Sequence, residues 1–360
     1  MIESFHIKNF KGLTDLELPL TRLTLLGGRN NVGKSTVLEA LFAFHDRFNP
    51  QLLVRSAVWR GMGALLGALV DPDLLWSPSF ANYDLSKPIE LAARIDDATQ
   101  TVTIKYLPNH PISLQTNQGI AGGAIITGQT DQPSTPAATL QLTYNVGGKD
   151  LLRTHTSILN GQLTYNVDLS EASTAPRIGL LNLRAHESEA VMAQGYGQLD
   201  IYGRQDTVLR FVNLLDPRIK ALSVVAIGNV PVIHADVGMG RKLPAAYLGD
   251  GVHRLLSIII YMAITENSML MIDEIDSGLH YSVLPKVWQA IAEASHEFGC
   301  QVIGTTHNYE CLVTANEALG GKHESDFSFI RMDRRGGVVV PKVYDFELFA
   351  EALKSNLELR

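Results

Sequence analysis

Residues 28–35 read GRNNVGKS, which is the glycine, lysine and serine spacing of a phosphate-binding P-loop. In such a loop, consecutive backbone N–H groups turn inward and hold phosphate oxygens. Gly28 and Gly33 permit backbone angles and a close approach to phosphate that a Cβ would obstruct. Lys34 places an ammonium within reach of the terminal phosphates, and the start of the following helix adds unpaired N–H donors. The segment therefore predicts a site for a nucleoside triphosphate.

Hydroxyl groups follow this lysine directly, because the next two residues are Ser35 and Thr36. The Ser35 hydroxyl is expected to be a ligand of the Mg²⁺ ion that accompanies the nucleotide. A strand-turn-helix can match the pattern by coincidence, but apolar residues precede this loop and recur at helical spacing after it, as a P-loop requires. The residues of this segment expected to bind nucleotide are Gly28, Arg29, Asn30, Asn31, Val32, Gly33, Lys34, Ser35 and Thr36.

Two carboxylates, Asp273 and Glu274, directly follow the apolar segment Met269–Ile272. Four apolar residues in a row are typical of a fully buried strand, and ligands of open α/β sheets lie at the carboxyl ends of strands. We therefore expect Asp273 to hold Mg²⁺, directly or through water, and Glu274 to polarise the attacking water. The plainer interpretation of such a pair is the beginning of a loop or a helix cap.

A histidine, His307, follows a second apolar segment, 302–306. Its ring nitrogen is placed to hydrogen-bond the γ-phosphate or the attacking water. A lone histidine is more often structural than functional. Because His307 ends the next predicted strand after the carboxylates, we interpret it as catalytic, together with Lys34 and Glu274.

A glycine-bounded segment, Gly249-Asp250-Gly251, directly precedes an apolar helix expected over 252–265. Backbone N–H groups at a helix N-terminus can bind an anion. The pattern predicts a second phosphate contact, although a simple junction between a loop and a helix explains it about as well.

The elements that must position these residues alternate between strands and helices, which is typical of a parallel α/β sheet with its ligand at the strand ends. Strands are expected over 2–10, 13–18, 23–26, 221–227, 231–235, 269–272 and 302–306. Helices are expected from Lys34 and over 187–192, 206–215, 252–265 and 282–298. The glycines at 195, 197 and 203 are expected to separate the second helix from the third.

A different pattern covers residues 89–183, where polar and apolar residues alternate with period two, as in β-strands. The hexapeptide QLTYNV occurs at 141–146 and again at 162–167, and Asn160-Gly161 predicts a hairpin turn before the second copy. We interpret the two copies as strands of one antiparallel sheet rather than as a meaningful repeat. Residues 119–136, rich in glycine, threonine and proline, are expected to form a surface loop.

The composition is that of a globular chain of 360 residues, with 46% hydrophobic and 19% charged residues. A net charge of −7 disfavours a generally basic nucleic-acid-binding surface, although a local basic surface is compatible with it. The only cysteines are Cys300 and Cys311, and the N-terminus lacks a signal-peptide pattern, so we expect a reducing cytoplasm. The longest apolar runs, 255–264 and 269–272, are too short to span a membrane.

The order of these motifs resembles the ABC-type ATPase head of the SMC, RecF and OLD (overcoming-lysogenization-defect) group. It runs from NFKG at 9–12 through the P-loop, a β-rich insertion, LGDG at 248–251, DE followed by DSGLH at 276–280, to TTHN at 305–308. The chain is most similar to stand-alone AAA-family ATP/GTP phosphatases related to OLD ATPase domains. The resemblance is well defined at the N-terminus and over 245–308, and only general elsewhere.

The resemblance implies an α/β head with a mixed or parallel sheet flanked by helices and a β-rich insertion lobe, which hydrolyses ATP with Mg²⁺ at a dimer interface. Residues 1–88 and 185–360 would form the head, and 89–184 the lobe. Gly249, Asp250 and Gly251 of one subunit would face the P-loop of another, and Asp276 would lie in a loop that crosses between subunits. Asn9, Phe10 and Lys11 would lie near the base or ribose of the nucleotide. Related ATPases usually carry a serine near Gly249, and this chain lacks that hydroxyl.

The family also implies partners. OLD proteins carry an additional Toprim nuclease domain, and too few residues follow His307 to build one, so a nuclease or other toxin would be a separate effector. The favoured function is a nucleotide-driven dimer switch in anti-phage defence or another DNA transaction, with a RecF-like DNA repair clamp as the alternative and an ABC transporter ATPase as the least favoured one. The sequence does not distinguish ATP from GTP and does not locate the glutamine that related ATPases use.

Two surface features complete the expectations. Basic residues that a fold could gather into a DNA-binding stripe are Arg204, Arg210, Arg218, Lys220, Arg241 and Lys242, although scattered surface charge is the favoured interpretation. The acidic amphipathic stretch 345–360 is expected to pack on the chain's own sheet rather than on a partner.

Overall fold

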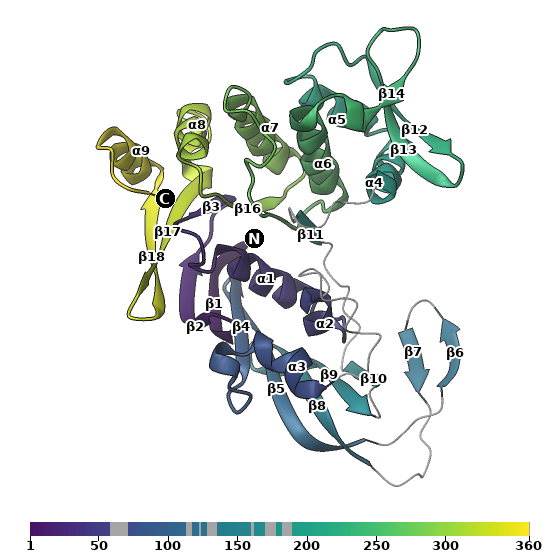
Figure 1. The fold of residues 1–360 in the computed structure, drawn as a ribbon, viewed down its shortest axis with the longest axis vertical. Helices are drawn as coiled ribbons and strands as arrows, with labels where there is room; N and C mark the ends of the chain where they lie inside the picture. Colours follow the sequence, from purple (N-terminus) through teal and green to yellow (C-terminus); the bar gives the residue numbers. More distant parts are fainter. Residues whose placement is uncertain are drawn as a thin grey trace. The chain divides into compact units, whose positions relative to one another are not determined.

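The computed structural model describes residues 1–57, 71–112, 117–121, 124–127, 135–159, 162–169, 178–181 and 189–359 (Figure 1). The chain divides into two compact units. The first comprises residues 1–3, 19–38 and 176–360, and the second comprises 4–18 and 39–175. Each unit is built from segments far apart in the sequence, and the functional boundaries expected at 88 and 184 remain a prediction.

The first unit is built on a six-stranded sheet with the order β11-β15-β16-β3-β17-β18. Neighbours from β11 to β17 are parallel, and β18 is antiparallel to β17. Every residue of β15, β16 and β3 is buried, which confirms the expected α/β sheet with a buried centre. The strands are β3 (Leu23–Gly27), β11 (Ile178–Leu181), β15 (Met269–Ile272), β16 (Gln301–Thr305), β17 (Phe327–Arg335) and β18 (Val338–Asp345).

Helices pack on this sheet, and α6, α7 and α8 lie side by side over it in Figure 1. The helices of the first unit are α4 (Glu189–Ile201), α5 (Gln205–Val212), α6 (Asp250–Ile264), α7 (Leu284–Glu297), α8 (Tyr309–Leu319) and α9 (Phe346–Lys354). The first five residues of α1 (Lys34–His45) also belong to it. No helix in the described part of the chain combines the length and apolar character needed to cross a bilayer.

The prediction of a helix that ends at 192 is wrong. Helix α4 continues to Ile201 and passes through Gly195 and Gly197, two of the glycines expected to separate it from the next helix. A Cβ at Gly195 would lie 3.2 Å from Cγ2 of Ile260 and 3.3 Å from Cγ2 of Ile264, both on α6. Gly195 therefore permits close packing of two helices, and this packing outweighs its low helix propensity.

Two further predictions for the first unit are confirmed. The strands expected at 221–227 and 231–235 are β12 (Ala221–Ile227) and β13 (Val230–Asp236), which pair with β14 (Leu243–Pro244) in a three-stranded sheet. The C-terminal stretch packs on its own sheet, since the Phe349 ring is fully buried 5.1 Å from the ring of Phe329.

The second unit contains most of a seven-stranded sheet with the order β10-β9-β8-β5-β4-β1-β2. Its strands are β1 (Ile2–Phe10), β2 (Leu13–Pro19), β4 (Ile89–Ile95), β5 (Ala98–Ile112), β8 (Thr135–Val146), β9 (Lys149–Leu159) and β10 (Gln162–Leu169). The hairpin β6 (Asn117–Ala121) and β7 (Ala124–Thr127) and the helices α2 (Leu52–Ala57) and α3 (Pro72–Trp76) complete it. The first two strands of the chain thus join the lobe's sheet and not the P-loop's sheet.

The β-rich expectation is partly corrected. Both QLTYNV copies lie in one sheet, on either side of β9 and antiparallel to it, as expected. The turn at 160–161 lies outside the described residues, although the strands that flank it pair in register. The described residues within 119–136 form strands rather than the expected loop. In addition, β11 pairs with β15 and so belongs to the first unit.

Candidate nucleotide site

The P-loop lies between β3 and α1, at the carboxyl edge of the parallel strands. Gly28 has a φ of 122° and Gly33 a φ of 105°, values that favour glycine. A Cβ at Gly28 would lie 2.3 Å from the carbonyl oxygen of Met332 on β17. The first glycine is therefore fixed by backbone packing between two strands as well as by phosphate chemistry.

The Lys34 ammonium lies against the loop that it follows. Its Nζ donates to the carbonyl oxygens of Gly28, at 2.6 Å, and Arg29, at 3.0 Å. Burial lowers the pKa of Lys34 below its ordinary value, and the nearby Asp273 and Glu274 carboxylates only partly offset that effect. The lysine is thus held inside the loop, close to both carboxylates.

A network of oxygen atoms joins the P-loop helix to the ends of two strands. Ser35 Oγ donates to Asp273 Oδ1 at 3.0 Å, and Thr305 Oγ1 donates to the same oxygen at 2.6 Å. Adjacent ligands of an octahedral ion with Mg–O distances of about 2.1 Å lie about 3 Å apart. Ser35 Oγ and Asp273 Oδ1 therefore have both the chemistry and the spacing of two Mg²⁺ ligands.

Glu274 and His307 lie next to each other at the ends of β15 and β16. Glu274 has a φ of 49°, and its N–H donates to Thr305 Oγ1 at 2.9 Å. Its Oε1 lies 3.8 Å from Nδ1 of His307, with the two side chains 39% and 50% exposed. The carboxylate and the imidazole thus share a solvent-accessible position beside the P-loop strand.

Sequence reasoning missed two residues that position this site. Thr305 hydrogen-bonds to the Asp273 carboxylate and to the N–H of Glu274. Its position at the end of a predicted strand, two residues before His307, was the sequence signal that could have identified it. Arg254 of α6 donates from Nη2 to the carbonyl oxygen of Asp273 at 3.3 Å. No sequence pattern indicated Arg254, because its partner is a backbone carbonyl group 19 residues later in the chain.

The segment after the carboxylates is tied to the same strand ends. Thr306 Oγ1 donates to Asp276 Oδ1 at 2.7 Å. Asn308, after His307, caps α8 by accepting a hydrogen bond from the N–H of Glu310 at 2.9 Å. Asp276 therefore sits in a fixed turn and not in a free loop.

Four of the predicted residues lie on elements other than the P-loop and the ends of β15 and β16. Gly249 and Asp250 are exposed at the start of α6, where a Cβ on Gly251 would lie 3.5 Å from the Leu279 side chain. The two clefts described below are lined by other residues of the described chain. Lys11 belongs to the second unit, where it forms an ion pair with Glu39.

Two clefts border the loop. One of about 290 Å³ is lined by Gly28, Arg29, Asn30, His307 and Glu358. The other, of about 780 Å³, is lined by Arg29, Asn30, Asn31, Val32, Arg331, Asp333, Arg334 and Arg335. The larger cleft, which we call the arginine cleft, has four arginines and one carboxylate, and so favours anions.

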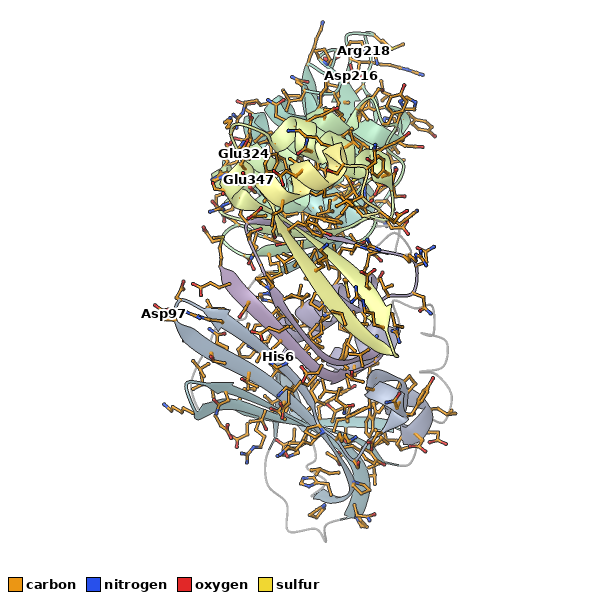
Figure 2. All side chains as sticks on the ribbon, turned by 90° about the vertical axis from the view of Figure 1, so that its left-hand side faces the viewer. His6, Asp97, Asp216, Arg218, Glu324 and Glu347 are labelled. Carbon is orange, nitrogen blue, oxygen red and sulfur yellow. The ribbon has the colours of Figure 1, made fainter. Side chains whose placement is uncertain are left out.

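Three of the basic residues considered for a DNA-binding stripe form ion pairs with carboxylates of this chain. Arg204 pairs with Glu266 at 2.6 Å, and Arg210 pairs with Glu297. Arg218 and Asp216, both labelled in Figure 2, pair at 2.8 Å. The hydrogen bond to Asp216 raises the pKa of Arg218. Three of the six candidate cations are thus neutralised locally, which agrees with scattered surface charge.

Two family models match the chain. Residues 1–135 match a model described as an AAA ATPase domain. Residues 159–312 match a model described as an AAA domain, putative AbiEii toxin, of a type IV toxin–antitoxin system. The first match contains the P-loop, and the second contains Asp273, Glu274 and His307.

The chain also resembles individual proteins. It is 22% identical, over 374 aligned residues, to an ATP/GTP phosphatase of Helicobacter pylori, with 96% of this chain and 95% of that protein covered. It is 30% identical over 96 residues to an OLD nuclease of Thermus scotoductus, a match that covers 27% of this chain and 15% of that protein. A solved SMC head bound to the C-winged helix domain of ScpA aligns with a TM-score of 0.48 at 16% identity, covering 98% of this chain and 99% of that one.

The two ATPase models match on both sides of residues 136–158, and between them they contain every residue of the predicted nucleotide site. The P-loop and the paired carboxylates lie at one edge of a single sheet, as that chemistry requires. The chain is accordingly an ATPase that matches AAA domain models on both sides of this gap and is similar to an ATP/GTP phosphatase of Helicobacter pylori.

Proposed function

We propose that this ATPase is Mg²⁺-dependent and that its site works by positioning and charge. Ser35 and Asp273 would hold the ion, which neutralises charge on the phosphates. The P-loop N–H groups and Lys34 would fix the terminal phosphates. Glu274 would orient the attacking water, and His307, 3.8 Å from it, would hydrogen-bond the γ-phosphate or the same water. The geometry of Ser35, Asp273 and Thr305 supports the metal assignment.

We further propose that two copies form each complete site, so that nucleotide state switches the chain between monomer and dimer. The observation that carries this proposal is the position of Gly249–Gly251 at the N-terminus of a 15-residue helix, where Gly249 and Asp250 are exposed and Gly251 is half-buried. Gly249, the N-cap residue, forms no side-chain cap, so the backbone donors of α6 suit an anion. Tyr247, two residues before the segment, is 78% exposed and suits a protein interface.

A mixing experiment tests the composite site. Lys34→Ala removes a P-loop contact, and Gly251→Glu places a carboxylate in the opposite half of the site, where it repels the γ-phosphate. Each variant alone is expected to be inactive. In a 1:1 mixture, half of the dimers are mixed and each has one intact site, so about a quarter of wild-type ATPase activity should return.

The control for this experiment is Gly251→Ala, which fits because its Cβ would make only ordinary contacts with Leu279 and Val283. Its activity should stay close to that of the wild type. If the mixture of Lys34→Ala and Gly251→Glu stays as inactive as its components while both variants keep the wild-type melting temperature, each site is complete within one chain and the dimer switch is wrong.

For the biological role, we propose that the switch works with a separate effector in defence against foreign DNA. The support is the partial similarity to a protein named OLD nuclease and to a domain model described as a putative toxin. A RecF-like clamp remains the alternative, because the arginine cleft offers four guanidinium groups beside the P-loop.

Direct DNA binding has a specific test at the arginine cleft. With ATP and Mg²⁺, the wild type should retard duplex DNA in a salt-dependent manner. The double variant Arg334→Glu and Arg335→Glu should weaken the complex and lower the slope of log K against log salt by about 2, because each lost phosphate contact removes about 0.9.

Arg218→Glu is the matched control, since Arg218 lies outside this cleft and already pairs with Asp216. It should leave the salt dependence unchanged. If the wild type shows no retardation at micromolar concentration, DNA is not a direct ligand and the partner is a protein.

A further inference from the structure

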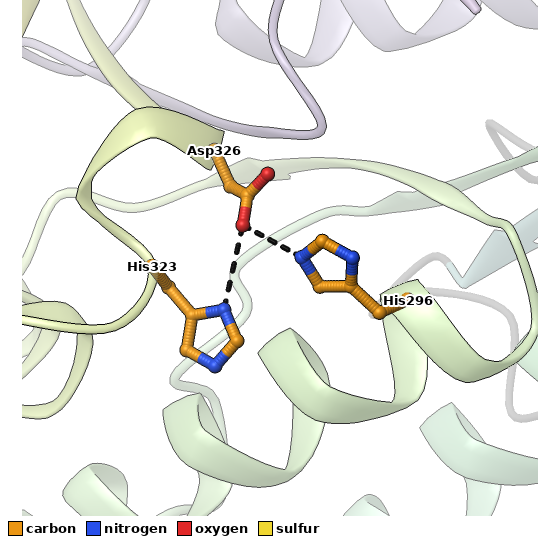
Figure 3. A group of neighbouring side chains, drawn as sticks. All are labelled: His296, His323 and Asp326. Carbon is orange, nitrogen blue, oxygen red and sulfur yellow. Dashed lines mark hydrogen bonds and ion pairs between the residues drawn. The ribbon is translucent and has the colours of Figure 1, made fainter.

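Two histidines and an aspartate meet on the side of the first unit away from the P-loop. His296 lies in the last turn of α7, and His323 and Asp326 lie in the segment between α8 and β17. His296 Nε2 is 2.6 Å from Asp326 Oδ2, and His323 Nδ1 is 3.4 Å from the same oxygen (Figure 3). The three atoms all lie within 4.8 Å of one another.

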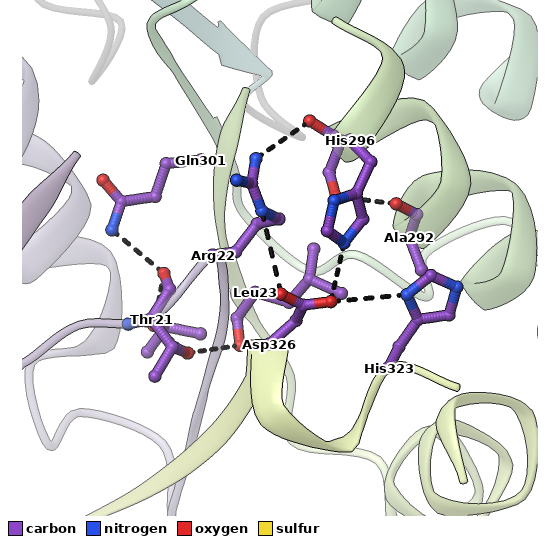
Figure 4. Close-up of polar contacts among 10 residues, drawn as sticks. Thr21, Arg22, Leu23, Ala292, His296, Gln301, His323 and Asp326 are labelled. Atoms are coloured by element: carbon purple, nitrogen blue, oxygen red, sulfur yellow. Dashed lines mark hydrogen bonds and ion pairs between the residues drawn. The ribbon is translucent and has the colours of Figure 1, made fainter. Parts of the chain in front are cut away.

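Strand direction separates this cluster from the nucleotide site. Arg22, beside the cluster, precedes β3, while Asp326 precedes β17 and Gln301 begins β16 (Figure 4). These parallel strands carry the P-loop and His307 at their opposite, carboxyl ends. The cluster therefore lies at the amino edge of the sheet and takes no part in holding the phosphates.

The ligand types fit a transition metal, as does the 3.4 Å separation of His323 Nδ1 from Asp326 Oδ2. The 2.6 Å pair of His296 and Asp326 is a hydrogen bond, which a metal ion would open to about 3.3 Å. Two imidazole nitrogens and one carboxylate oxygen are a common donor set for Zn²⁺, whose tetrahedral ligands at about 2.0–2.1 Å lie about 3.3 Å apart. We propose that His296, His323 and Asp326 form a binding site for a divalent transition metal of the zinc class. With three protein ligands, the site leaves a fourth position for water or another ligand.

Burial gives the site a closed and an open side. The His323 side chain is 7% exposed and that of Asp326 is 19% exposed, so both are held in place by packing. The His296 side chain is 47% exposed and provides the entry path for an ion. A half-open site of this kind binds metal from solution without local unfolding.

Surrounding groups orient the carboxylate. Arg22 Nε lies 3.8 Å from Asp326 Oδ1, the oxygen that faces away from the histidines, and Arg22 Nη1 donates to the Ser295 carbonyl oxygen at 3.2 Å. Burial acts to raise the pKa of Asp326, but the hydrogen bonds and charges of His296, His323 and Arg22 outweigh it and lower that pKa. The contact with Arg22 at Oδ1 thus leaves Oδ2 directed toward both histidines.

A metal ion explains the position of the His323 ring better than a hydrogen bond to Asp326 does. Both rings converge on one oxygen of Asp326, and the contact from His323 Nδ1, at 3.4 Å, is long for a hydrogen bond. A metal on Nδ1 of His323 would replace the weak 3.4 Å contact by a coordinate bond. It would also join the end of α7 to the start of β17, and so stabilise the amino edge of the sheet.

The test uses the whole chain, treated with a chelator, dialysed, and titrated without nucleotide. Zn²⁺ binding is measured by calorimetry, and Co²⁺ binding by the visible absorption that tetrahedral coordination produces. We expect one Zn²⁺ per chain at this site, a Co²⁺ spectrum with nitrogen and oxygen ligands, and a higher melting temperature with Zn²⁺. His296→Ala and Asp326→Asn should each weaken Zn²⁺ binding by at least about 10-fold and abolish the Co²⁺ spectrum.

His6→Ala is the matched control. His6, labelled in Figure 2, forms the same kind of pair, with Nε2 2.6 Å from Asp15 Oδ1. Among the described residues, no second histidine joins this pair. It should leave the metal titration unchanged. Because His296 is half exposed, its variant should fold, which the melting temperature without metal verifies. If the wild type binds no Zn²⁺ below about millimolar concentration, or if His296→Ala binds as tightly as the wild type, the metal site is wrong and the cluster is a hydrogen-bonded one.

Discussion

The Lys34→Ala variant loses detectable ATP binding. Lys34 is held inside the P-loop by the carbonyl oxygens of Gly28 and Arg29, so its ammonium needs little reorganisation to reach phosphate oxygens. Two charge-assisted hydrogen bonds are together worth about 3–6 kcal/mol. Their loss weakens ATP binding by at least about 100-fold. Removing Lys34 also leaves Asp273 and Glu274 to repel the triphosphate without a nearby ammonium, which adds to the effect.

The measurement is equilibrium binding of a fluorescent ATP analogue in the presence of Mg²⁺. Lys286→Ala, which removes an exposed lysine of α7, is the matched control and should bind as the wild type does. Binding by Lys34→Ala within about threefold of the wild type would show that the loop does not hold the terminal phosphates.

The Glu274→Gln variant binds ATP but turns it over at least about 100-fold more slowly than the wild type, because general-base catalysis contributes 10²–10⁴-fold. Binding persists since glutamine has the same shape and the Glu274 N–H still donates to Thr305 Oγ1. Turnover is lost because an amide cannot accept the proton of the attacking water. With hydrolysis blocked, the ATP-bound dimer that we propose should accumulate.

Single-turnover hydrolysis and light scattering measure the two effects separately. Glu310→Gln, which changes an exposed acid three residues after His307, is the control and should hydrolyse ATP normally. Unchanged hydrolysis by Glu274→Gln would remove Glu274 from its proposed role. A strictly monomeric mass with ATP and Mg²⁺ would instead contradict the composite site and leave the catalytic role intact.

Much of the first unit was predictable because its signals are local. The P-loop follows from residue types at fixed spacing, and β15 follows from four successive apolar residues before two carboxylates. These patterns record what the backbone must do over a few residues, namely turn tightly at Gly28 or run through the centre of a sheet. The meeting of Ser35 with Asp273 then follows from the rule that parallel strands end at one edge.

Other features of the fold could not be predicted because they depend on contacts between segments that are far apart in the sequence. Gly195 looked like a helix end, but the neighbouring α6 makes it a site of close packing. The sequences of β1 and β11 do not indicate which of the two sheets each strand joins, because a strand can pair with any complementary sheet edge.

The sequence by itself determined that this chain binds a nucleoside triphosphate, since the chemistry of the P-loop is encoded in consecutive residues. Only the tertiary structure decided that Thr305 and Arg254 hold Asp273 in place, that Gly251 packs beside Leu279, and that His296, His323 and Asp326 meet. The reason is physical: each of these depends on distances between residues far apart in the sequence, which packing of the helices and strands sets.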